Sequence, residues 1–202
     1  CIKGENVMAG YWKNPKATAE TIIDGWLHTG DRGYLCKEDP RFLYVTGRFK
    51  SLLIAADGEK YSPEGYEDSL ADGSKFIETT MLYNNQSAYT TALIVPNREA
   101  LKRRGCNLNT EDGCRAALQE IQKDIMRFRK GGDQQGMFPE RWLPTTFAVL
   151  KEPFTEQNQM INSTMKMVRG KIEKAYAQRL DYIYTSEGKA IDNPQNIDAL
   201  KA

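Results

Sequence analysis

The chain has 202 residues, of which 40% are hydrophobic and 10% aromatic, and its 28 Lys and Arg residues balance 27 Asp and Glu residues. The net charge of +1 excludes a strongly basic nucleic-acid binder, and no apolar run approaches the roughly 20 residues that a membrane-spanning helix needs. The four cysteines lack CxxC spacing, which favours reduced thiols in a cytoplasmic protein over a metal or disulfide site.

The first fifty residues predict a short helix followed by strands. Asn14 can cap a helix that begins at Pro15 and runs to about Ile22, since proline suits the first helical position. The Asp24-Gly25 pair tolerates a tight turn into a short strand, and the aromatic and β-branched run at 42–46 predicts another.

The next segment predicts a hairpin, a helix and two further strands. The hairpin joins 51–54 to 60–61 through an Asp57-Gly58 turn, and Ser62-Pro63 opens a short helix that ends near Leu70. A polar loop favours antiparallel pairing of the two strand-forming runs that follow, at 79–83 and 90–95.

The C-terminal half predicts two longer helices and one more strand. Apolar residues recur at helical spacing over 110–130, and Gly131-Gly132 ends this helix. A strand is expected at 145–150, a helix at 165–180, and a loop with a short terminal helix after residue 184. This order predicts an α+β fold in which helices flank a small mixed or antiparallel sheet, preceded by a β-rich segment.

Two short segments combine charged residues with glycine. Asp31 directly follows Thr29-Gly30 after a strand, where its two carboxylate oxygens can accept the vicinal hydroxyls of a ribose. An Asx turn or a helix cap would use the same residue. The second segment, residues 47–50, places Arg48 and Lys50 after a strand, where a solvated loop is the alternative.

Together with Gly10-Tyr11-Trp12-Lys13-Asn14-Pro15, these segments resemble the acyl-adenylate-forming superfamily in order and spacing. That superfamily contains acyl-CoA synthetases, luciferases and the adenylation domains of peptide synthetases, and the chain resembles long-chain fatty-acid–CoA ligases most. The resemblance covers most of the chain. It implies that residues 1–49 end a large N-terminal AMP-binding domain and that residues 50–202 form a mobile C-terminal lid.

The resemblance also implies roles for individual residues. Asp31 matches the aspartate that binds the ribose hydroxyls of ATP and of the acyl-adenylate, with Thr29 in the same nucleotide-binding segment, and Arg48 matches an arginine near the ribose and phosphate. Lys50 falls on the hinge about which the lid swings between adenylation and thioester formation. Gly58 lies in a loop that turns toward the pantetheine channel, where glycine allows close backbone approach.

The run Asn162-Ser163-Thr164-Met165-Lys166-Met167-Val168-Arg169 resembles the family loop T-P-T-x-K-x-x-R, with Ser163 where proline is common. The match implies that Lys166 is the catalytic lysine, whose ammonium neutralises charge as the carboxylate attacks the α-phosphate. An exposed lysine at a helix start is the alternative. Lys171 and Lys174 are expected on a solvated helix face, and no residue is assigned to a protein-bound metal.

The resemblance implies the C-terminal portion of an acyl-CoA synthetase that uses ATP, Mg²⁺ and coenzyme A to convert a carboxylic acid into its thioester. The resemblance to long-chain ligases implies a fatty acid, while the length and unsaturation of its chain, or an aromatic acid, stay open. Because the chain begins with Cys1 rather than Met, we expect a piece of a longer enzyme that is inactive alone and works with its own N-terminal domain. An enzyme that loads a carrier protein, and a non-catalytic interaction domain of the same fold, are the alternatives.

The segment 101–136 is longer than compact members of the family require. Its extra length could serve to bind a partner, a second copy in a homo-oligomer, or the inner face of a membrane as a peripheral contact. The basic run Lys102-Arg103-Arg104 within it is expected to be a solvated helix end. No nucleic-acid partner is expected.

Overall fold

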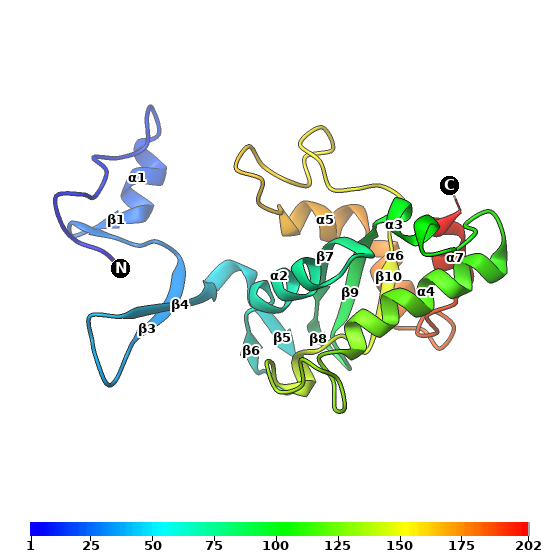
Figure 1. Cartoon of the computed structure of the whole chain (residues 1–202). Coiled ribbons are helices and arrows are strands. Elements are labelled where there is room, and N and C mark those ends of the chain that lie inside the picture. Colours follow the sequence, from blue (N-terminus) through cyan, green and yellow to red (C-terminus); the bar gives the residue numbers. More distant parts are fainter. Residues whose placement is uncertain (202) are drawn as a thin grey trace. The chain divides into compact units, whose positions relative to one another are not determined.

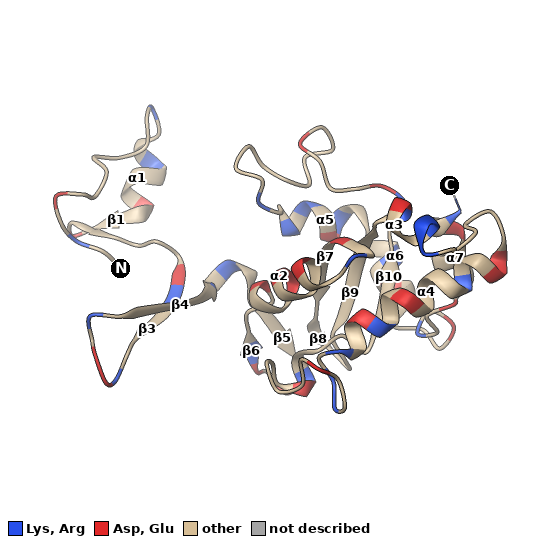
Figure 2. Cartoon of the chain, viewed as in Figure 1, with Lys and Arg blue, Asp and Glu red and all other residues tan. Residues whose placement is uncertain are grey.

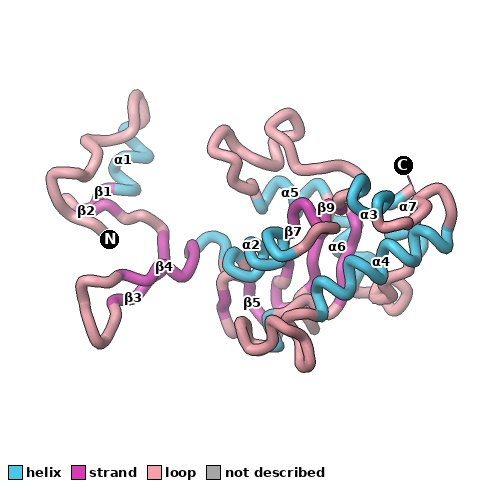
Figure 3. The backbone as a smooth tube through the Cα atoms, viewed as in Figure 1, coloured by secondary structure: helices cyan, strands magenta, loops and turns pink. Residues whose placement is uncertain are grey.

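A computed structural model of the protein describes residues 1–201 and divides the chain into two compact units, Cys1–Leu52 and Leu53–Ala202 (Figure 1). Strands and helices alternate with long loops in both units (Figure 3). None of the helices in this described part is both long and apolar enough to cross a membrane.

The N-terminal unit contains one helix, two antiparallel strand pairs and a terminal 3₁₀ turn. Its elements are α1 (Pro15–Thr21), β1 (Ile22–Ile23), β2 (Trp26–Leu27), β3 (Asp31–Leu35), β4 (Leu43–Arg48) and η1 (Phe49–Ser51). The Asn14 side chain accepts the Ala17 N–H and so caps α1, as predicted. The Asp24-Gly25 turn joins β1 to β2, also as predicted, and both turn residues have positive φ.

None of residues 1–52 is buried within the N-terminal unit. The large apolar side chains of the β3–β4 hairpin are all exposed: Tyr34, Leu35, Leu43, Tyr44 and Val45. Strand pairing rather than a hydrophobic core therefore holds this unit together. The register pairs Tyr34 with Tyr44 on one face of the hairpin and Leu35 with Leu43 on the other. Exposed apolar side chains in such numbers mark a place where other protein packs.

The C-terminal unit is built on a three-stranded mixed sheet in the order β10-β9-β7. β7 (Ile77–Tyr83) pairs antiparallel with the central strand β9 (Thr91–Pro96), which confirms the predicted pairing. β10 (Thr146–Val149) pairs with β9 in parallel. A second sheet has the order β6-β5-β8 and comprises β5 (Leu53–Ala55), β6 (Lys60–Tyr61) and β8 (Asn85–Ser87). β5 and β6 form the predicted hairpin.

Helices cover both faces of the three-stranded sheet. Along β9, Ala92 and Ile94 join one buried cluster and Leu93 and Val95 the other, as the period of two in a strand requires. The first cluster includes residues of α2 (Glu64–Gly73), α3 (Arg98–Arg103), α4 (Glu111–Met126) and α7 (Pro194–Leu200). The second includes residues of α5 (Arg169–Ala175) and α6 (Ala177–Ile183). These layers confirm the predicted α+β class.

The segment 101–136 is an integral part of this core. Apolar residues of α4 that recur at helical spacing, among them Leu118, Ile121 and Ile125, are buried in the first cluster. Helix α4 ends at Met126 rather than near residue 130. The turns after it have hydrogen bonds between residues three positions apart, such as Arg129 N to Met126 O, instead of the four of an α-helix. The segment thus contributes to the core of the C-terminal unit.

The helix predicted at 165–180 is wrong at its start and in its middle. Met165 has a φ of 60° and belongs to a loop, and α5 begins only at Arg169. Tyr176, with φ −107° and ψ 21°, then separates α5 from α6. Within α5, Ile172 is buried and Ala175 at its end is exposed.

Candidate functional site

The β3–β4 hairpin brings Asp31 and Arg48 together. The two residues are register partners across the antiparallel pair, and Arg48 Nε donates to Asp31 Oδ1 at 3.1 Å. Their side chains keep 37% and 50% exposure, so both remain accessible to a ligand. The charge-assisted bond orients the carboxylate without burying it.

Thr29 supports the turn that leads into β3. Its Oγ1 accepts the Asp31 N–H at 3.1 Å, and the intervening Gly30 has a φ of 77°. Gly30 O accepts the Phe49 N–H at 3.0 Å, which ties this turn to the end of β4. Thr29 thus positions the backbone of Asp31, while no described residue binds the second carboxylate oxygen, Oδ2. That oxygen and Oδ1 can accept the two hydroxyls of a vicinal diol.

Lys50 lies in the middle of η1, two residues before Leu52, the last residue of the N-terminal unit. Its side chain is exposed, and the turn passes directly into β5 after Leu52. A change of a few backbone angles here would reorient everything that follows in the chain.

Gly58 lies at the tip of the β5–β6 hairpin. Its φ is 83°, and a Cβ built on it would meet nothing within 4 Å. The loop is closed by the bond from Gly58 N to Ala55 O at 2.9 Å, and the Asp57 carboxylate accepts the Glu59 N–H at 3.0 Å. The positive φ, not a lack of space, therefore explains the glycine.

Lys166 lies in a tight, exposed loop of the C-terminal unit. Asn162 organises this loop, because its Oδ1 accepts the backbone N–H groups of Thr164 and Lys166, each at 3.0 Å. The Lys166 carbonyl in turn accepts the Asn162 N–H at 3.0 Å, and a β-bridge joins Ile161 to Met167. The lysine backbone is thus fixed on both sides, whereas its ammonium is free to meet an anion.

The surroundings of Lys166 are basic. Arg169, Lys171 and Lys174 follow on α5, against Glu173 as the acidic residue of that helix, and Figure 2 shows this concentration of blue on α5. Lys171 also donates to Gln159, which lies upstream in the same long loop. Arg169 is paired with Glu67, so the positive charge that favours an anionic ligand comes from Lys166, Lys171 and Lys174.

A buried ion pair, absent from the sequence predictions, lies directly beyond this loop. Arg169, 12% exposed, pairs with Glu67 of α2, 3% exposed. Burial raises the pKa of Glu67, and the Arg169 guanidinium and the Leu82 N–H oppose that rise by stabilising the carboxylate. The motif contains Arg169, but nothing in the sequence identifies Glu67 as its partner.

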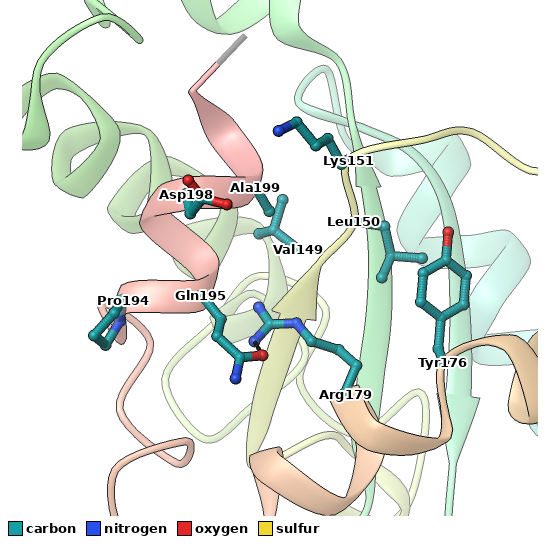
Figure 4. A pocket seen from close by; sticks show the side chains of 9 residues that line it. All are labelled: Val149, Leu150, Lys151, Tyr176, Arg179, Pro194, Gln195, Asp198 and Ala199. Atoms are coloured by element: carbon teal, nitrogen blue, oxygen red, sulfur yellow. Dashed lines mark hydrogen bonds between the residues drawn. The ribbon is translucent and has the colours of Figure 1, made fainter.

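A separate cavity of about 430 Å³ lies among β10, α6 and α7 (Figure 4). Leu150 and Tyr176 form part of its apolar wall, and Arg179 points across it toward Gln195. Arg179 donates to Gln195 Oε1 at 2.6 Å and also to Asn196, and burial lowers its pKa to about 10. None of the residues predicted for nucleotide chemistry lines this cavity.

Residues 1–201 contain no cluster of protein side chains suited to binding a metal ion. No group of three or more His, Cys, Asp or Glu side chains gathers there in a way that could hold an ion. The carboxylate of Asp31 is engaged by Arg48 instead.

Comparison with protein families gives a match over most of the C-terminal unit. The sequence model described as the AMP-binding enzyme C-terminal domain matches residues 50–188. The match contains both Gly58 and Lys166 and begins at Lys50.

Curated relatives extend the similarity to the N-terminal unit. Long-chain-fatty-acid–CoA ligase 1 of Cavia porcellus is 29% identical over 193 residues, which is 92% of this chain and 27% of that protein. Long chain acyl-CoA synthetase 1 of Arabidopsis thaliana is 26% identical over 188 residues, covering 91% and 28% of the two chains. The chain thus spans little more than a quarter of the length of these relatives.

Solved structures with a similar fold include adenylation domains. That of the carboxylate reductase from Mycobacterium chelonae has a TM-score of 0.76 at 29% identity, covering 91% of this chain and 27% of that one. The adenylation and carrier didomain of the carboxylic acid reductase from Segniliparus rugosus, in complex with AMP, has a TM-score of 0.70 at 25% identity, covering 93% and 25%.

Proposed function

The chain belongs to the family of AMP-binding enzyme C-terminal domains, and we propose that it is the C-terminal portion of an ATP-dependent acyl-CoA synthetase. The whole enzyme would activate a carboxylic acid to an acyl-adenylate with release of pyrophosphate, then transfer the acyl group to coenzyme A. The long-chain ligases among the relatives support a fatty acid as substrate.

The observation that carries this proposal is the Asp31–Arg48 pair. Strand register holds a half-exposed carboxylate beside a guanidinium, and one carboxylate oxygen has no described partner. A ribose offers two adjacent hydroxyl donors and a nearby phosphate, so one nucleotide satisfies both charged groups. A scaffold without nucleotide chemistry would need neither residue.

Lys166 supports the adenylation step. Its backbone is fixed by Asn162 while its ammonium remains exposed in a basic surround. We propose that this ammonium stabilises the negative charge that develops on the α-phosphate, as preorganised cations do at a reacting phosphoryl group. Mg²⁺ would enter with the phosphates of ATP.

Loading of a carrier protein is the second candidate. The likeness to adenylation domains of carboxylic acid reductases favours it, because one of those structures includes a carrier domain. The curated relatives named as CoA ligases favour free coenzyme A. The two acceptors both end in a thiol, so the acceptor has to be settled by assay.

The domain arrangement is also part of the proposal. Residues 1–49 would complete a large N-terminal domain, and the rest of that domain would cover the exposed apolar side chains of the β3–β4 hairpin. Residues 50–202 would act as the lid, with Lys50 as the hinge and Gly58 on the side of coenzyme A. The 202-residue chain alone would then be inactive.

We propose a cytoplasmic location, because the four cysteines form no disulfide bond, as expected in a reducing compartment. A membrane contact through the basic run at 102–104 finds little support, because Lys102 pairs with Glu99 and Arg104 pairs with Glu120. Paired cations attract an anionic lipid surface only weakly.

The test uses the full-length protein. Fatty-acid-dependent exchange of pyrophosphate into ATP measures adenylation, and thioester formation is compared between free coenzyme A and a carrier protein. We expect exchange with a long-chain acid and transfer to free coenzyme A. Absence of exchange with every carboxylic acid tested would exclude the proposed reaction.

A further inference from the structure

The loop that carries Lys166 ends in a buried anchor. Arg169, the first residue of α5, donates through Nη1 to Leu82 O at 3.2 Å and through Nη2 to Glu67 Oε2. Glu67 Oε1 accepts the Leu82 N–H at 2.6 Å. One arginine and one carboxylate thus bind both backbone groups of a single strand residue.

Leu82 lies on β7, which is an edge strand of the three-stranded sheet. Its N–H and C=O have no neighbouring strand on the outer side, so Glu67 and Arg169 take the place that a strand would have. Glu67 comes from α2 on one face of the sheet, and Arg169 begins α5 on the other. The pair therefore joins three elements at one point.

This pair is suited to fixing position. A buried ion pair contributes little net stability over apolar side chains of the same size, because desolvation offsets the attraction. Its hydrogen bonds are nevertheless directional, and the bidentate contacts of arginine restrict the side chain in several directions. Only Met167 and Val168 separate Arg169 from Lys166.

We propose that Glu67 and Arg169 are positioning residues that fix the Lys166 loop for the adenylation step. This inference rests on the proposed function of Lys166. Asn162 closes the loop locally, and the Glu67–Arg169 pair ties the closed loop to the edge of the sheet. Disruption of the pair would displace the ammonium without removing it.

Two variants of the full-length enzyme distinguish a role in positioning the Lys166 loop from a role in folding. Arg169→Lys keeps the charge, but a single ammonium cannot hold both Glu67 and Leu82 O as the guanidinium does. The double variant Glu67→Met/Arg169→Met removes both charges together, which a fold tolerates far better than one unpaired charge. Arg127→Met is the matched control, because Arg127 likewise binds a carboxylate and a backbone carbonyl, those of Asp133 and Gly73.

Adenylation is measured by pyrophosphate exchange, and thioester formation is measured separately from pre-made acyl-adenylate. We expect both pair variants to lose about 10- to 100-fold in adenylation, as small displacements of catalytic groups do, with thioester formation within about twofold. Amide hydrogen exchange of residues 161–168 should become faster in both. Arg127→Met should retain both half-reactions.

Lys166→Ala distinguishes this inference from the proposed function. If Lys166→Ala slows adenylation but neither pair variant does, the positioning role is overturned and the function stands. An equal loss of both half-reactions in the pair variants would show a general structural role and would also overturn it. If Lys166→Ala has no effect, the assignment of Lys166 fails and the inference fails with it.

Discussion

Asp31 and Arg48 lie 17 positions apart in the chain and meet through backbone pairing of β3 with β4. Neither side chain lies in a hydrophobic core, so neither contributes packing to the unit. Exposed ion pairs of this kind contribute at most about 1 kcal/mol to stability. Substitution of either residue should therefore alter ligand binding and leave the fold intact.

Asp31→Ala in the full-length enzyme should raise the apparent KM for ATP about 10- to 100-fold. The expected change equals the loss of one hydrogen bond to a charged acceptor, about 1.5–3 kcal/mol. Adenylation rates measured against ATP concentration check this expectation.

Asp39→Ala is the matched control. Asp39 also forms an exposed ion pair in the N-terminal unit, with Arg41 at 2.7 Å, in the connection between β3 and β4. We expect its ATP dependence to equal that of the parent enzyme. Equal KM values for Asp31→Ala and Asp39→Ala would remove Asp31 from the nucleotide site.

Lys166→Ala should slow adenylation by about 100-fold, or ~2.7 kcal/mol, as expected when one preorganised charge at a reacting centre is removed. Thioester formation from pre-made acyl-adenylate should change little, because the proposed swing of the lid about Lys50 carries Lys166 away from the nucleotide before the thiol attacks. The unfolding midpoint should stay the same, since the side chain is exposed. A loss confined to thioester formation would contradict this role.

Side chains form hydrogen bonds with outward-facing backbone groups at both edges of the three-stranded sheet. Glu67 and Arg169 bind the outer backbone groups of β7 at Leu82. At the opposite edge, Asn196 of α7 accepts the Val149 N–H of β10 at 2.7 Å and donates to Phe147 O at 3.0 Å. Buried backbone groups need such partners, and satisfied edges do not pair with other chains.

Asn196→Ala should lower the free energy of unfolding by about 2–4 kcal/mol, because it leaves a buried N–H and a buried C=O without partners. The neighbouring Gln195→Ala serves as control, since Gln195 binds only the Arg179 side chain among the described residues. Urea unfolding followed by circular dichroism measures both. Similar, small losses in the two variants would contradict the edge role of Asn196.

Strong periodicity and good caps made several elements predictable. Helix α1 followed from Asn14 and Pro15, and the buried face of α4 followed from apolar residues at helical spacing. Strands β7 and β9 followed from their β-branched and aromatic residues and the polar loop between them. In each case the local sequence carries the information that the fold uses.

Long-range contacts were not predictable in this way. β3 was missed because Asp31, Arg32 and Gly33 dilute its strand pattern, and its pairing depends on β4. The late start of α5 depends on bonds made by Asn162 and on the contact of Arg169 with a helix 102 positions earlier. The candidate residues Asp31, Arg48 and Lys166 came from motifs, whereas Glu67 became visible only in the structure.

The two units of the chain differ in kind. The C-terminal unit contains both hydrophobic clusters, and the N-terminal unit contains no buried residue. Burial of apolar surface is the main source of stability, so nearly all of the stability should belong to residues 53–202. The proposed hinge residue Lys50 lies two residues before the end of the N-terminal unit.

Residues 53–202 expressed alone should unfold cooperatively, with the same urea midpoint as the 202-residue chain. Limited proteolysis of the whole chain should cut within residues 1–52 first, because exposed strands and loops without a core are the most accessible to a protease. Mass spectrometry of the fragments and urea titration check both expectations. A lower midpoint for 53–202, or early cuts within its sheet, would contradict them.

Lys50→Pro tests the hinge in the full-length enzyme. Proline fixes φ near −65° and restricts the residue before it, here Phe49, so the η1 turn can adopt fewer backbone states. If two orientations of the lid serve the two half-reactions, one of them should be favoured by the locked turn and the other lost. We therefore expect pyrophosphate exchange and thioester formation to fall by clearly different factors.

Lys50→Ala removes the side chain but keeps the backbone free, and should preserve both rates. Equal loss of both half-reactions in Lys50→Pro, with the fold intact, would exclude Lys50 as the pivot.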